Sequence, residues 1–244
     1  MNEIGDPEGI GGGWTIVVPV KSLARAKSRL GSTLSPLQRR ALVVAMATDV
    51  ITACRECPSV SAVKVVSTDP DVAALATDLG AKFVTESGHR TAADSAITLQ
   101  SDPLNAALAG ALTGLTGAVA VVAADLPELD SRILTRILDS ASQHRHSVVV
   151  DHRGEGTTMA MWTAGTDRVC LFGPGSAANF LRQGAVTLSV DERSGGAASR
   201  DVDIPSDVIR LAGRQVGLAT AKTLREQLGQ PSCRVHAESA TMVW

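Results

Sequence analysis

The sequence predicts a single α/β domain in which a mostly parallel β-sheet lies between two layers of helices. Three observations support this fold class. Apolar, β-branched runs alternate with helix-like segments from residue 14 to about residue 228, which is the pattern of successive β-α units. The run at 118–124 is apolar throughout, as expected for a strand buried on both faces. Ser or Asp directly before proline opens several helices, a strong start signal.

The first strand is predicted at 14–20, and the first helix begins at the capping box S-P-L-Q at 35–38 and continues to about residue 56. Further strands are predicted at 62–67, 81–84, 118–124, 147–151, 158–163 and 186–190. Further helices are predicted at 70–79, 104–115, 131–143, 174–183 and from Pro205 onward. The segments 21–34 and 86–101 are expected to be loops. The domain spans 14–228, with a flexible leader at 1–13 and a tail of uncertain order at 229–244.

The composition argues against several classes of function. A net charge of -2 provides no basic face, and 2% aromatic residues without tyrosine provide no base-stacking platform, so we expect no nucleic-acid partner. No apolar run approaches the roughly 20 residues of a membrane span, and the first residues do not resemble a signal peptide. We therefore expect a cytoplasmic protein without a membrane partner. The sequence does not determine its oligomeric state.

Cysteine and histidine do not form a recognisable site. Cys54 and Cys57 are a C-x-x-C pair, but no second pair or suitably spaced histidine completes a zinc site. His144 and His146 follow a predicted helix and are expected to be solvated near its negative end. Familiar phosphate, dinucleotide, metalloprotease and hydrolase motifs are also missing from the sequence.

Asp125 is the first candidate for a functional residue. It directly follows the buried run, and Pro127 then prevents the strand from continuing. Open α/β sheets bind ligands at the carboxyl ends of their strands. Asp125 could instead cap the next helix, but Asp130 is better placed for that role. A metal or phosphate role for Asp125 is therefore favoured.

Asp201 and Asp203 form a second candidate site. Two residues apart in extended chain, their carboxylates point to the same side. Such a pair favours a neutralising cation, and Mg²⁺ prefers a few carboxylates together with phosphate oxygens and water. Alternatively, Asp203 could cap the helix at Pro205, for which Asp201 lies too far upstream. Asp207 is expected to interact with that helix's dipole.

The loop after the first strand carries four cations, Lys21, Arg25, Lys27 and Arg29. Its position at the ligand edge suits a polyphosphate, although runs of charge are often only solvated turns. As candidates for binding the polyphosphate, Lys27 and Arg29 are ranked above Arg25. Small residues in two further loops, at 156–157 and 173–176, offer backbone N–H groups to a phosphate. Each signal is weak alone, but all fall on one predicted edge.

Several motifs together resemble a known family. They are P-V-K-x-L-x-x-A-K-S-R-L at 19–30, D-P-L-N at 102–105, A-D-L-P at 124–127, G-x-G-T at 154–157, F-G-P-G-S at 172–176 and D-V-D-x-P at 201–205. Over residues 14–227 the chain resembles the phospholactate/phosphoenolpyruvate guanylyltransferases (CofC/FbiD) of coenzyme F-420 biosynthesis. The resemblance implies a Rossmann-like nucleotidyltransferase fold of the nucleotide-diphospho-sugar transferase type.

The resemblance also implies roles for individual residues. Magnesium would be held by Asp125, Asp201 and Asp203. The phosphate of the small phospho-acid would contact Thr157, Gly173 and Ser176. The triphosphate would lie at Lys21, Lys27 and Arg29, with Lys27, Arg29 and Asp125 as the catalytic set, and Asn105 would lie near the nucleoside. Glu155 and Thr158, beside the implied acceptor pocket, stand where the family often has Thr and Asn.

The implied reaction transfers GMP from GTP to the phosphate of phosphoenolpyruvate or 2-phospho-L-lactate and releases pyrophosphate. A phosphate monoester is already largely an anion at neutral pH, so the attack needs no histidine or cysteine base. Catalysis would then depend on positioning and electrostatics. Three alternatives stay open: a related transferase with another nucleotide or acceptor, a non-catalytic nucleotide-binding module, and a glycosyltransferase.

Overall fold

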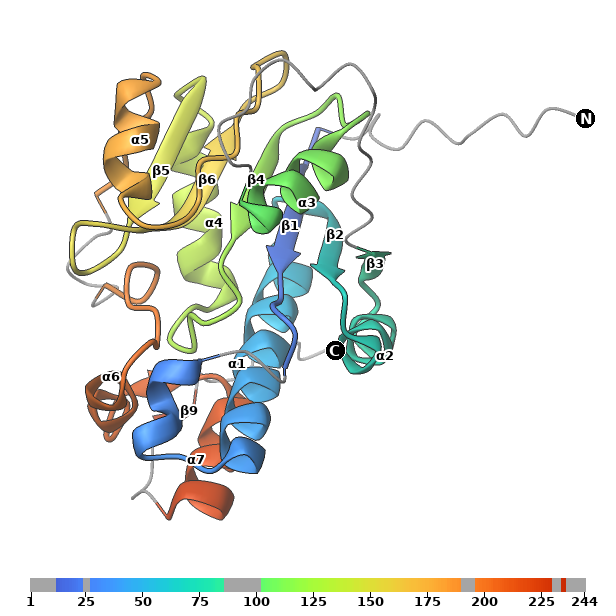
Figure 1. Cartoon of the computed structure of the whole chain (residues 1–244). Coiled ribbons are helices and arrows are strands. Elements are labelled where there is room, and N and C mark those ends of the chain that lie inside the picture. The colour runs from blue at the N-terminus through green and yellow to red at the C-terminus, as the bar shows by residue number, and fades with distance from the viewer. Residues whose placement is uncertain (1–11, 24–26, 86–101, 190–195, 230–233, 236–244) are drawn as a thin grey trace, which may run out of the picture.

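The computed structural model describes residues 12–23, 27–85, 102–189, 196–229 and 234–235. Its central sheet has seven strands in the order β3-β2-β1-β4-β6-β5-β7 (Figure 1). The strands are β1 (Trp14–Pro19), β2 (Val60–Ser67), β3 (Lys82–Thr85), β4 (Val119–Val122), β5 (His146–Val150), β6 (Thr157–Trp162) and β7 (Val186–Thr187). All neighbouring pairs are parallel except those of β6, which runs antiparallel to both β4 and β5. The predicted three-layer, mostly parallel α/β fold is confirmed.

All the helices except α7 begin within two residues of the positions that the sequence signals predict. They are α1 (Pro36–Glu56), α2 (Pro70–Asp78), α3 (Pro103–Leu112), α4 (Ser131–Ala141), α5 (Ser176–Arg182), α6 (Pro205–Arg210) and α7 (Leu218–Leu228), with a 3-10 turn η1 (Ser28–Ser32). The capping box of α1 is present, because Ser35 and Gln38 exchange side-chain and backbone hydrogen bonds. Asp130 caps α4 by accepting from the Ile133 N–H at 2.7 Å, as expected.

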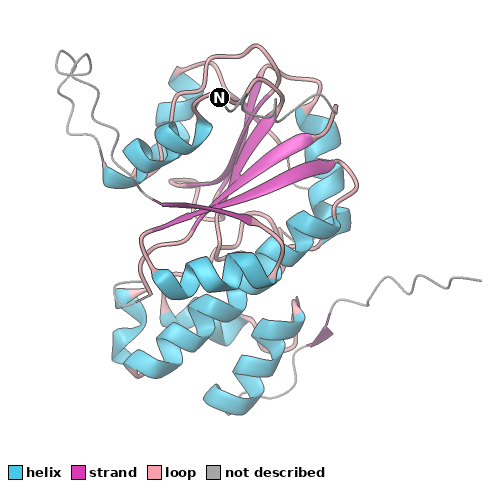
Figure 2. Cartoon of the chain, turned by 90° about the vertical axis from the view of Figure 1, so that its right-hand side faces the viewer, coloured by secondary structure: helices cyan, strands magenta, loops and turns pink. Residues whose placement is uncertain are grey.

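Two apolar layers hold the helices against the sheet. One buried cluster joins side chains of α1, α2, α4 and α7 to one face, and a second joins α3 and α5 to the other. Figure 2 shows the helices on both sides of the strands. Within the described residues, no helix is both long and apolar enough to cross a membrane.

Three features differ from the sequence-based expectations. The strand predicted at 186–190 is only two residues long. His146 was expected to be solvated, but it opens β5 opposite Trp162 and stacks on that indole, with ring centroids 5.0 Å apart. Helix α7 and a small parallel pair, β8 (Gln215–Val216) with β9 (Arg234–Val235), were not among the predicted elements. Residues 1–11 of the predicted leader (1–13), the expected loop at 86–101, and residues 230–233 and 236–244 of the predicted tail lie outside the described residues.

The topology brings several chain segments to one edge. Strands β1 and β4 are parallel neighbours, so the loops that follow them leave the sheet at the same edge. Because β6 is reversed, its first residues lie at that edge too. Helices α6 and α7 lie beyond the ends of the strands in Figure 1. Two backbone hydrogen bonds tie them to the segment after β4: Val202 N–H donates to Asp125 O, and Gly217 N–H donates to Pro127 O.

Candidate functional site

A cleft of about 570 Å³ opens at this edge of the sheet. One wall is formed by the segment after β1, with Lys21, Lys27 and Arg29. The opposite wall is formed by the β5–β6 turn and the segment before α5. Three acids lie at its floor. The residues that line it include Lys21, Lys27, Arg29, Asp125, Asp151, Arg153, Glu155, Gly156, Thr157, Gly173, Ser176, Asp201 and Asp203. All predicted site residues except Asn105 therefore line one cleft.

Asp125, Asp201 and Asp203 converge at this floor although 76 residues separate the first from the second. Each offers a carboxylate oxygen, and the three oxygens lie within 4.8 Å of one another. The cause is local: the hydrogen bond from Val202 N–H to Asp125 O fixes the 201–203 segment beside the end of β4 at 3.2 Å. The side chains of Asp201 and Asp203 flank Val202, which points into the core and is fully buried.

The pKa values of Asp201 and Asp203 are shifted in opposite directions. Burial, reinforced by the neighbouring charges of Asp125 and Asp203, raises the pKa of Asp201 to about 7. Its Oδ1 is buried and lacks a hydrogen bond in the described structure; His152 Nδ1 faces that oxygen at 3.4 Å without hydrogen-bond geometry. Burial works to raise the pKa of Asp203, but Lys27, together with Asp201 and Arg153, outweighs it and that pKa is lowered. An incompletely compensated set of three carboxylates fits a hard divalent cation.

Lys27 reaches these acids from the wall after β1. Its ammonium contacts Asp125 Oδ2 and lies 2.5 Å from Asp203 Oδ1. Burial alone would lower the pKa of Lys27, but the two carboxylates outweigh it and raise that pKa. Lys27 has a left-handed backbone, φ 54°, the only described non-glycine residue with positive φ. The predicted triphosphate residues Lys21 and Arg29 line the same wall with exposed side chains.

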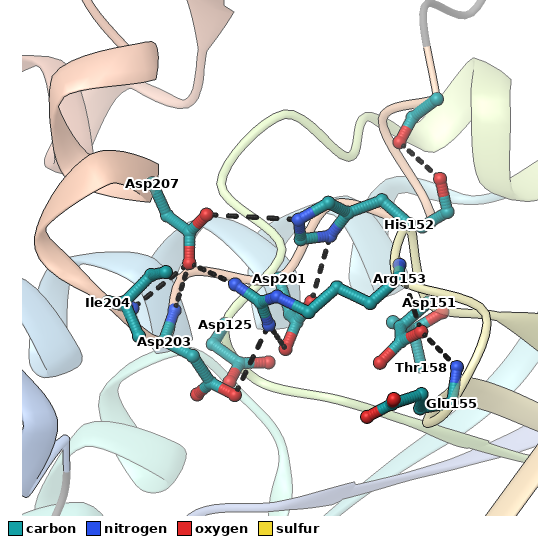
Figure 3. A network of polar contacts seen from close by, with 12 residues as sticks. Asp125, Asp151, His152, Arg153, Glu155, Thr158, Asp201, Asp203, Ile204 and Asp207 are labelled. Carbon is teal, nitrogen blue, oxygen red and sulfur yellow. Dashed lines mark hydrogen bonds and ion pairs between the residues drawn. The ribbon is translucent and has the colours of Figure 1, made fainter.

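Asp207, Arg153 and His152 form a second layer of polar side chains beside the three acids (Figure 3). Asp207 is 4% exposed, and its Oδ2 accepts the Asp203 and Ile204 N–H groups at 2.9 and 3.0 Å. The same oxygen accepts from Arg153 Nη2 at 2.8 Å. Asp207 therefore both caps the start of α6 and anchors a partly buried ion pair. Asp203 does not cap this helix, because Asp207 occupies that role.

The other wall carries the residues expected to contact the acceptor. Asp151 Oδ1 accepts the Arg153 and Glu155 N–H groups, which shapes the turn that leads to Thr157. A side chain at Gly156 would place its Cβ 2.5 Å from Asp151 Oδ2, so a larger residue here would displace the carboxylate that shapes the turn. Thr157 Oγ1 is buried and lacks a hydrogen-bond partner in the described structure. A buried hydroxyl without a partner at the cleft is available to a ligand.

Gly173 and Ser176 complete this wall. Gly173 has φ +124°, a conformation that favours glycine, and Ser176 is 1% exposed at the first position of α5. Asn105 does not line the cleft. Its amide instead donates to Phe172 O at 2.8 Å and accepts from Phe172 N–H at 2.9 Å, which fixes the start of the 172–176 segment.

Thr158, one of the two departures from the family pattern, is 1% exposed. Its hydroxyl donates to Ala198 O at 2.6 Å, with Val149 O at 3.2 Å. This hydroxyl joins β6 to the turn before Asp201. The other departure, Glu155, is an exposed residue at the cleft.

Sequence reasoning missed His152 and Arg153, and it assigned Asp207 only to the helix dipole. One signal was present: the two residues lie in the short segment between β5 and the G-x-G-T motif. Their contacts with Asp207 depend on how α6 folds back over the end of the sheet. No local pattern in the sequence encodes that approach.

Comparison with known proteins identifies relatives that span most of the chain. A family model described as guanylyl transferase, CofC like, matches residues 14–181. A phosphoenolpyruvate guanylyltransferase of Nocardia farcinica is 40% identical over 225 residues, which cover 90% of this chain and 93% of the relative. One of Sanguibacter keddieii is 37% identical over 241 residues, covering 86% and 84%. One of Mycobacterium leprae is 34% identical over 214 residues, covering 85% and 91%.

Solved structures share the fold at low sequence identity. A protein from Desulfovibrio desulfuricans described as a nucleotide-diphospho-sugar transferase superposes with a TM-score of 0.55 at 13% identity, covering 72% of this chain and 79% of that one. A nucleotidyl transferase from Methanothermobacter thermautotroptrophicus gives a TM-score of 0.50 at 16% identity, covering 82% and 96%. The fold is that of the nucleotidyltransferases of the nucleotide-diphospho-sugar transferase type, as the sequence predicts.

Proposed function

Because the chain belongs to the CofC family of guanylyl transferases, we propose that this nucleotidyltransferase moves GMP from GTP to the phosphate of phosphoenolpyruvate and releases pyrophosphate. The relatives named above are phosphoenolpyruvate guanylyltransferases. 2-Phospho-L-lactate is the second acceptor to test, since it differs from phosphoenolpyruvate only in the saturation of the carbon skeleton. Either product would be an intermediate of coenzyme F-420 biosynthesis, and the reaction would take place in the cytoplasm.

The observation that carries this proposal is the convergence of Asp125, Asp201 and Asp203 at the floor of a cleft with two different walls. Carboxylates of this kind are ligands for Mg²⁺, which leaves room for phosphate oxygens and water. When bound there, the ion would offset the repulsion between two phosphates and stabilise charge on the reacting one. Asp125, Asp201 and Asp203 are the residues that would hold it.

The wall after β1 suits the donor nucleotide. Lys21, Lys27 and Arg29 line it, and their fixed positive charges would hold the triphosphate and stabilise the departing pyrophosphate. Lys27 and Arg29, with Asp125, form the proposed catalytic set. Asn105 would act near the nucleoside only indirectly, because both polar atoms of its amide bind Phe172.

The opposite wall suits the acceptor. Thr157 offers a buried hydroxyl without a described partner, and Gly173 and Ser176 border the same space. The acceptor's phosphate would attack the α-phosphate in line, so that one P–O bond forms as the bond to pyrophosphate breaks. Since that phosphate is already largely an anion, the chain needs to orient it and does not need to remove a proton.

The test is a matrix of donors and acceptors. The protein would be incubated with Mg²⁺, with GTP, ATP, CTP or UTP, and with phosphoenolpyruvate or 2-phospho-L-lactate, while pyrophosphate release is measured. We expect acceptor-dependent release with GTP and phosphoenolpyruvate, and loss of release in Asp125→Asn. Release with another nucleotide alone would identify a different nucleotidyltransferase. Binding of nucleotide without acceptor-dependent release would identify a binding module.

A further inference from the structure

The cations of the cleft are unequally distributed between its walls. Of the lysines and arginines that line it among the described residues, Lys21, Lys27 and Arg29 belong to the wall after β1. Arg153 alone comes from the β5–β6 turn on the opposite wall. That second wall also carries the carboxylates of Asp151 and Glu155. A phosphorylated acid that enters there therefore meets two acidic side chains and a single positively charged one.

The geometry of Arg153 is that of an anchored cation with one free side. Its Nη2 donates to Asp207 Oδ2 at 2.8 Å, and that oxygen also accepts two backbone N–H groups, so the anchor is rigid. Its Nη1 lies farther from the metal-site acids, 3.8 Å from Asp203 Oδ2 and 4.0 Å from Asp201 Oδ2. The side chain is 30% exposed. In Figure 3 Arg153 extends across Asp201 towards Asp203 and Asp207.

From these observations we propose that Arg153 contacts the acceptor's phosphate, and that Asp207 is the positioning residue that directs the guanidinium at it. This inference rests on the proposed function and adds to it a residue on the acceptor side. The two contacts of Nη1 exceed hydrogen-bond length, so its N–H groups can bind a ligand without breaking the anchor. A guanidinium suits this task because its fork of donors matches a phosphate, and it keeps its charge at any physiological pH.

The competing interpretation is that Arg153 only offsets the negative charge of the acids. The two roles differ in what they do to substrates. A cation that only offsets charge would change metal affinity and stability when removed, and would affect the two substrates equally. A cation that contacts the acceptor would change the affinity for phosphoenolpyruvate and leave that for GTP nearly unchanged.

The experiment compares Arg153→Met, Arg153→Lys and Asp207→Asn with the wild type. Arg132→Met, which removes an exposed guanidinium of α4 outside the cleft lining, serves as the control. Steady-state kinetics would give KM for each substrate, and calorimetry would give the affinity of Mn²⁺-loaded protein for phosphoenolpyruvate. Arg153→Met removes the closest cation of the buried Asp207. The double variant Arg153→Met/Asp207→Asn therefore tests the loss of the guanidinium in a protein that also lacks the Asp207 charge.

We expect Arg153→Met and the double variant to weaken phosphoenolpyruvate binding and raise its KM by about 10- to 100-fold, the effect of losing a charge-assisted hydrogen-bond pair. The KM for GTP should change less than about threefold. Arg153→Lys should recover part of the loss, and Asp207→Asn should show a smaller loss with the same substrate selectivity. Arg132→Met should match the wild type.

Phosphoenolpyruvate affinity within twofold of the wild type in Arg153→Met would overturn the inference. So would an equal rise in the KM for GTP. Either result is compatible with an active guanylyltransferase, since it concerns one side chain. Failure of the proposed function is a separate observation, namely wild-type protein that binds phosphoenolpyruvate but gives no pyrophosphate with GTP. Wild-type protein that does not bind phosphoenolpyruvate would overturn both.

Discussion

The ammonium of Lys27 lies 2.5 Å from Oδ1 of Asp203, a residue 176 positions later in the chain, and it also contacts Asp125. A side-chain cation thus stands between two of the three carboxylates that we assign to a divalent ion. The Lys27 ammonium and a metal ion would compete for the same carboxylate oxygens. Metal binding and the position of Lys27 should therefore be coupled.

Lys27→Met tests this coupling. Without the ammonium, the three carboxylates repel one another more strongly, so in the absence of nucleotide Mn²⁺ should bind about tenfold more tightly. Turnover should nevertheless fall about 100-fold, because a cation at the reacting phosphates is lost. Electron paramagnetic resonance of free Mn²⁺ measures the first effect. Lys21→Met, which removes a cation from the same wall, should leave Mn²⁺ affinity unchanged. Weaker Mn²⁺ binding by Lys27→Met would show that the lysine supports the ion.

The raised pKa of Asp201 predicts a pH-dependent stability of the metal-free protein. Folding raises this pKa to about 7 from an ordinary value near 4. Between these two pH values the folded state binds more protons than the unfolded state. The stabilisation that comes from the protonated Asp201 carboxyl is therefore complete below about pH 4 and is lost as the pH rises through 7. In EDTA, the free energy of unfolding of the wild type should fall by on the order of 2–3 kcal/mol relative to Asp201→Asn between pH 5 and 8.

Urea unfolding at several pH values measures this difference. The comparison with Asp201→Asn isolates one group, because every other titrating residue is shared. A difference that stays constant from pH 5 to 8 would mean that the Asp201 carboxyl titrates normally. Asp201→Asn should also bind Mn²⁺ more weakly, since an amide replaces a charged ligand.

Asn105→Ala should affect the acceptor through the 172–176 segment. The substitution removes both hydrogen bonds to Phe172, and we expect the segment with Gly173 and Ser176 to move more freely. We expect the binding free energy of phosphoenolpyruvate to weaken by about 1–1.5 kcal/mol, which corresponds to a rise in its KM of about tenfold. Steady-state kinetics test this, with Asn179→Ala, a half-buried asparagine of α5 outside the cleft lining, as control. A larger effect on GTP than on phosphoenolpyruvate would instead place Asn105 with the nucleoside.

Gly217→Ala should destabilise the fold without changing substrate selectivity. The backbone at Gly217 is open to any residue, with φ -63°, but an added Cβ would lie 2.1 Å from Asp49 Cγ. The Asp49 carboxylate accepts the Ala219 and Thr220 N–H groups at 2.9 and 2.8 Å and so caps α7 from α1. We expect the free energy of unfolding of Gly217→Ala to be about 2–3 kcal/mol lower than that of the wild type.

Thermal or urea unfolding measures this loss. The matched control is Gly117→Ala, where an added Cβ meets nothing within 4 Å. Equal stability of the two variants would mean that Asp49 moves aside at no cost. Because both glycines lie outside the cleft lining, the ratio of the two substrate KM values should be unchanged in each variant.

The central part of the site could be predicted from the sequence because its signals are local. A buried apolar run that ends in Asp125 fixes one carboxylate at the ligand edge of the sheet. Two aspartates in extended chain fix two more on a common side. What sequence reasoning could not supply was the hydrogen bond between Val202 and Asp125 that joins the two segments.

The reversed strand β6 was not predicted, although a signal was available. Only residues 151–156 separate β5 from β6, which is too short for a parallel crossover and long enough for a hairpin. The same reversal explains the wrong expectation for His146, which was read as the end of a helix. In the hairpin it faces Trp162 across the strands, and burial lowers its pKa.

The anchor formed by Arg153 and Asp207 could not be predicted because it depends on long-range packing. The two residues are 54 positions apart, and they meet only when α6 folds over the end of the sheet. A carboxylate in the first turn of a helix fits an exposed interaction with the helix dipole equally well. Only its 4% exposure and three hydrogen bonds distinguish the anchoring role.

The most direct test of the shared metal site is a crystal structure of the protein grown with MnCl₂ and GTP, with anomalous diffraction recorded at the manganese edge. We predict an anomalous peak within coordination distance of carboxylate oxygens from Asp125, Asp201 and Asp203, with the Lys27 ammonium moved away from Asp125 and towards the triphosphate. A manganese peak elsewhere in the cleft, with Lys27 still held between Asp125 and Asp203, would contradict the assignment of these three acids.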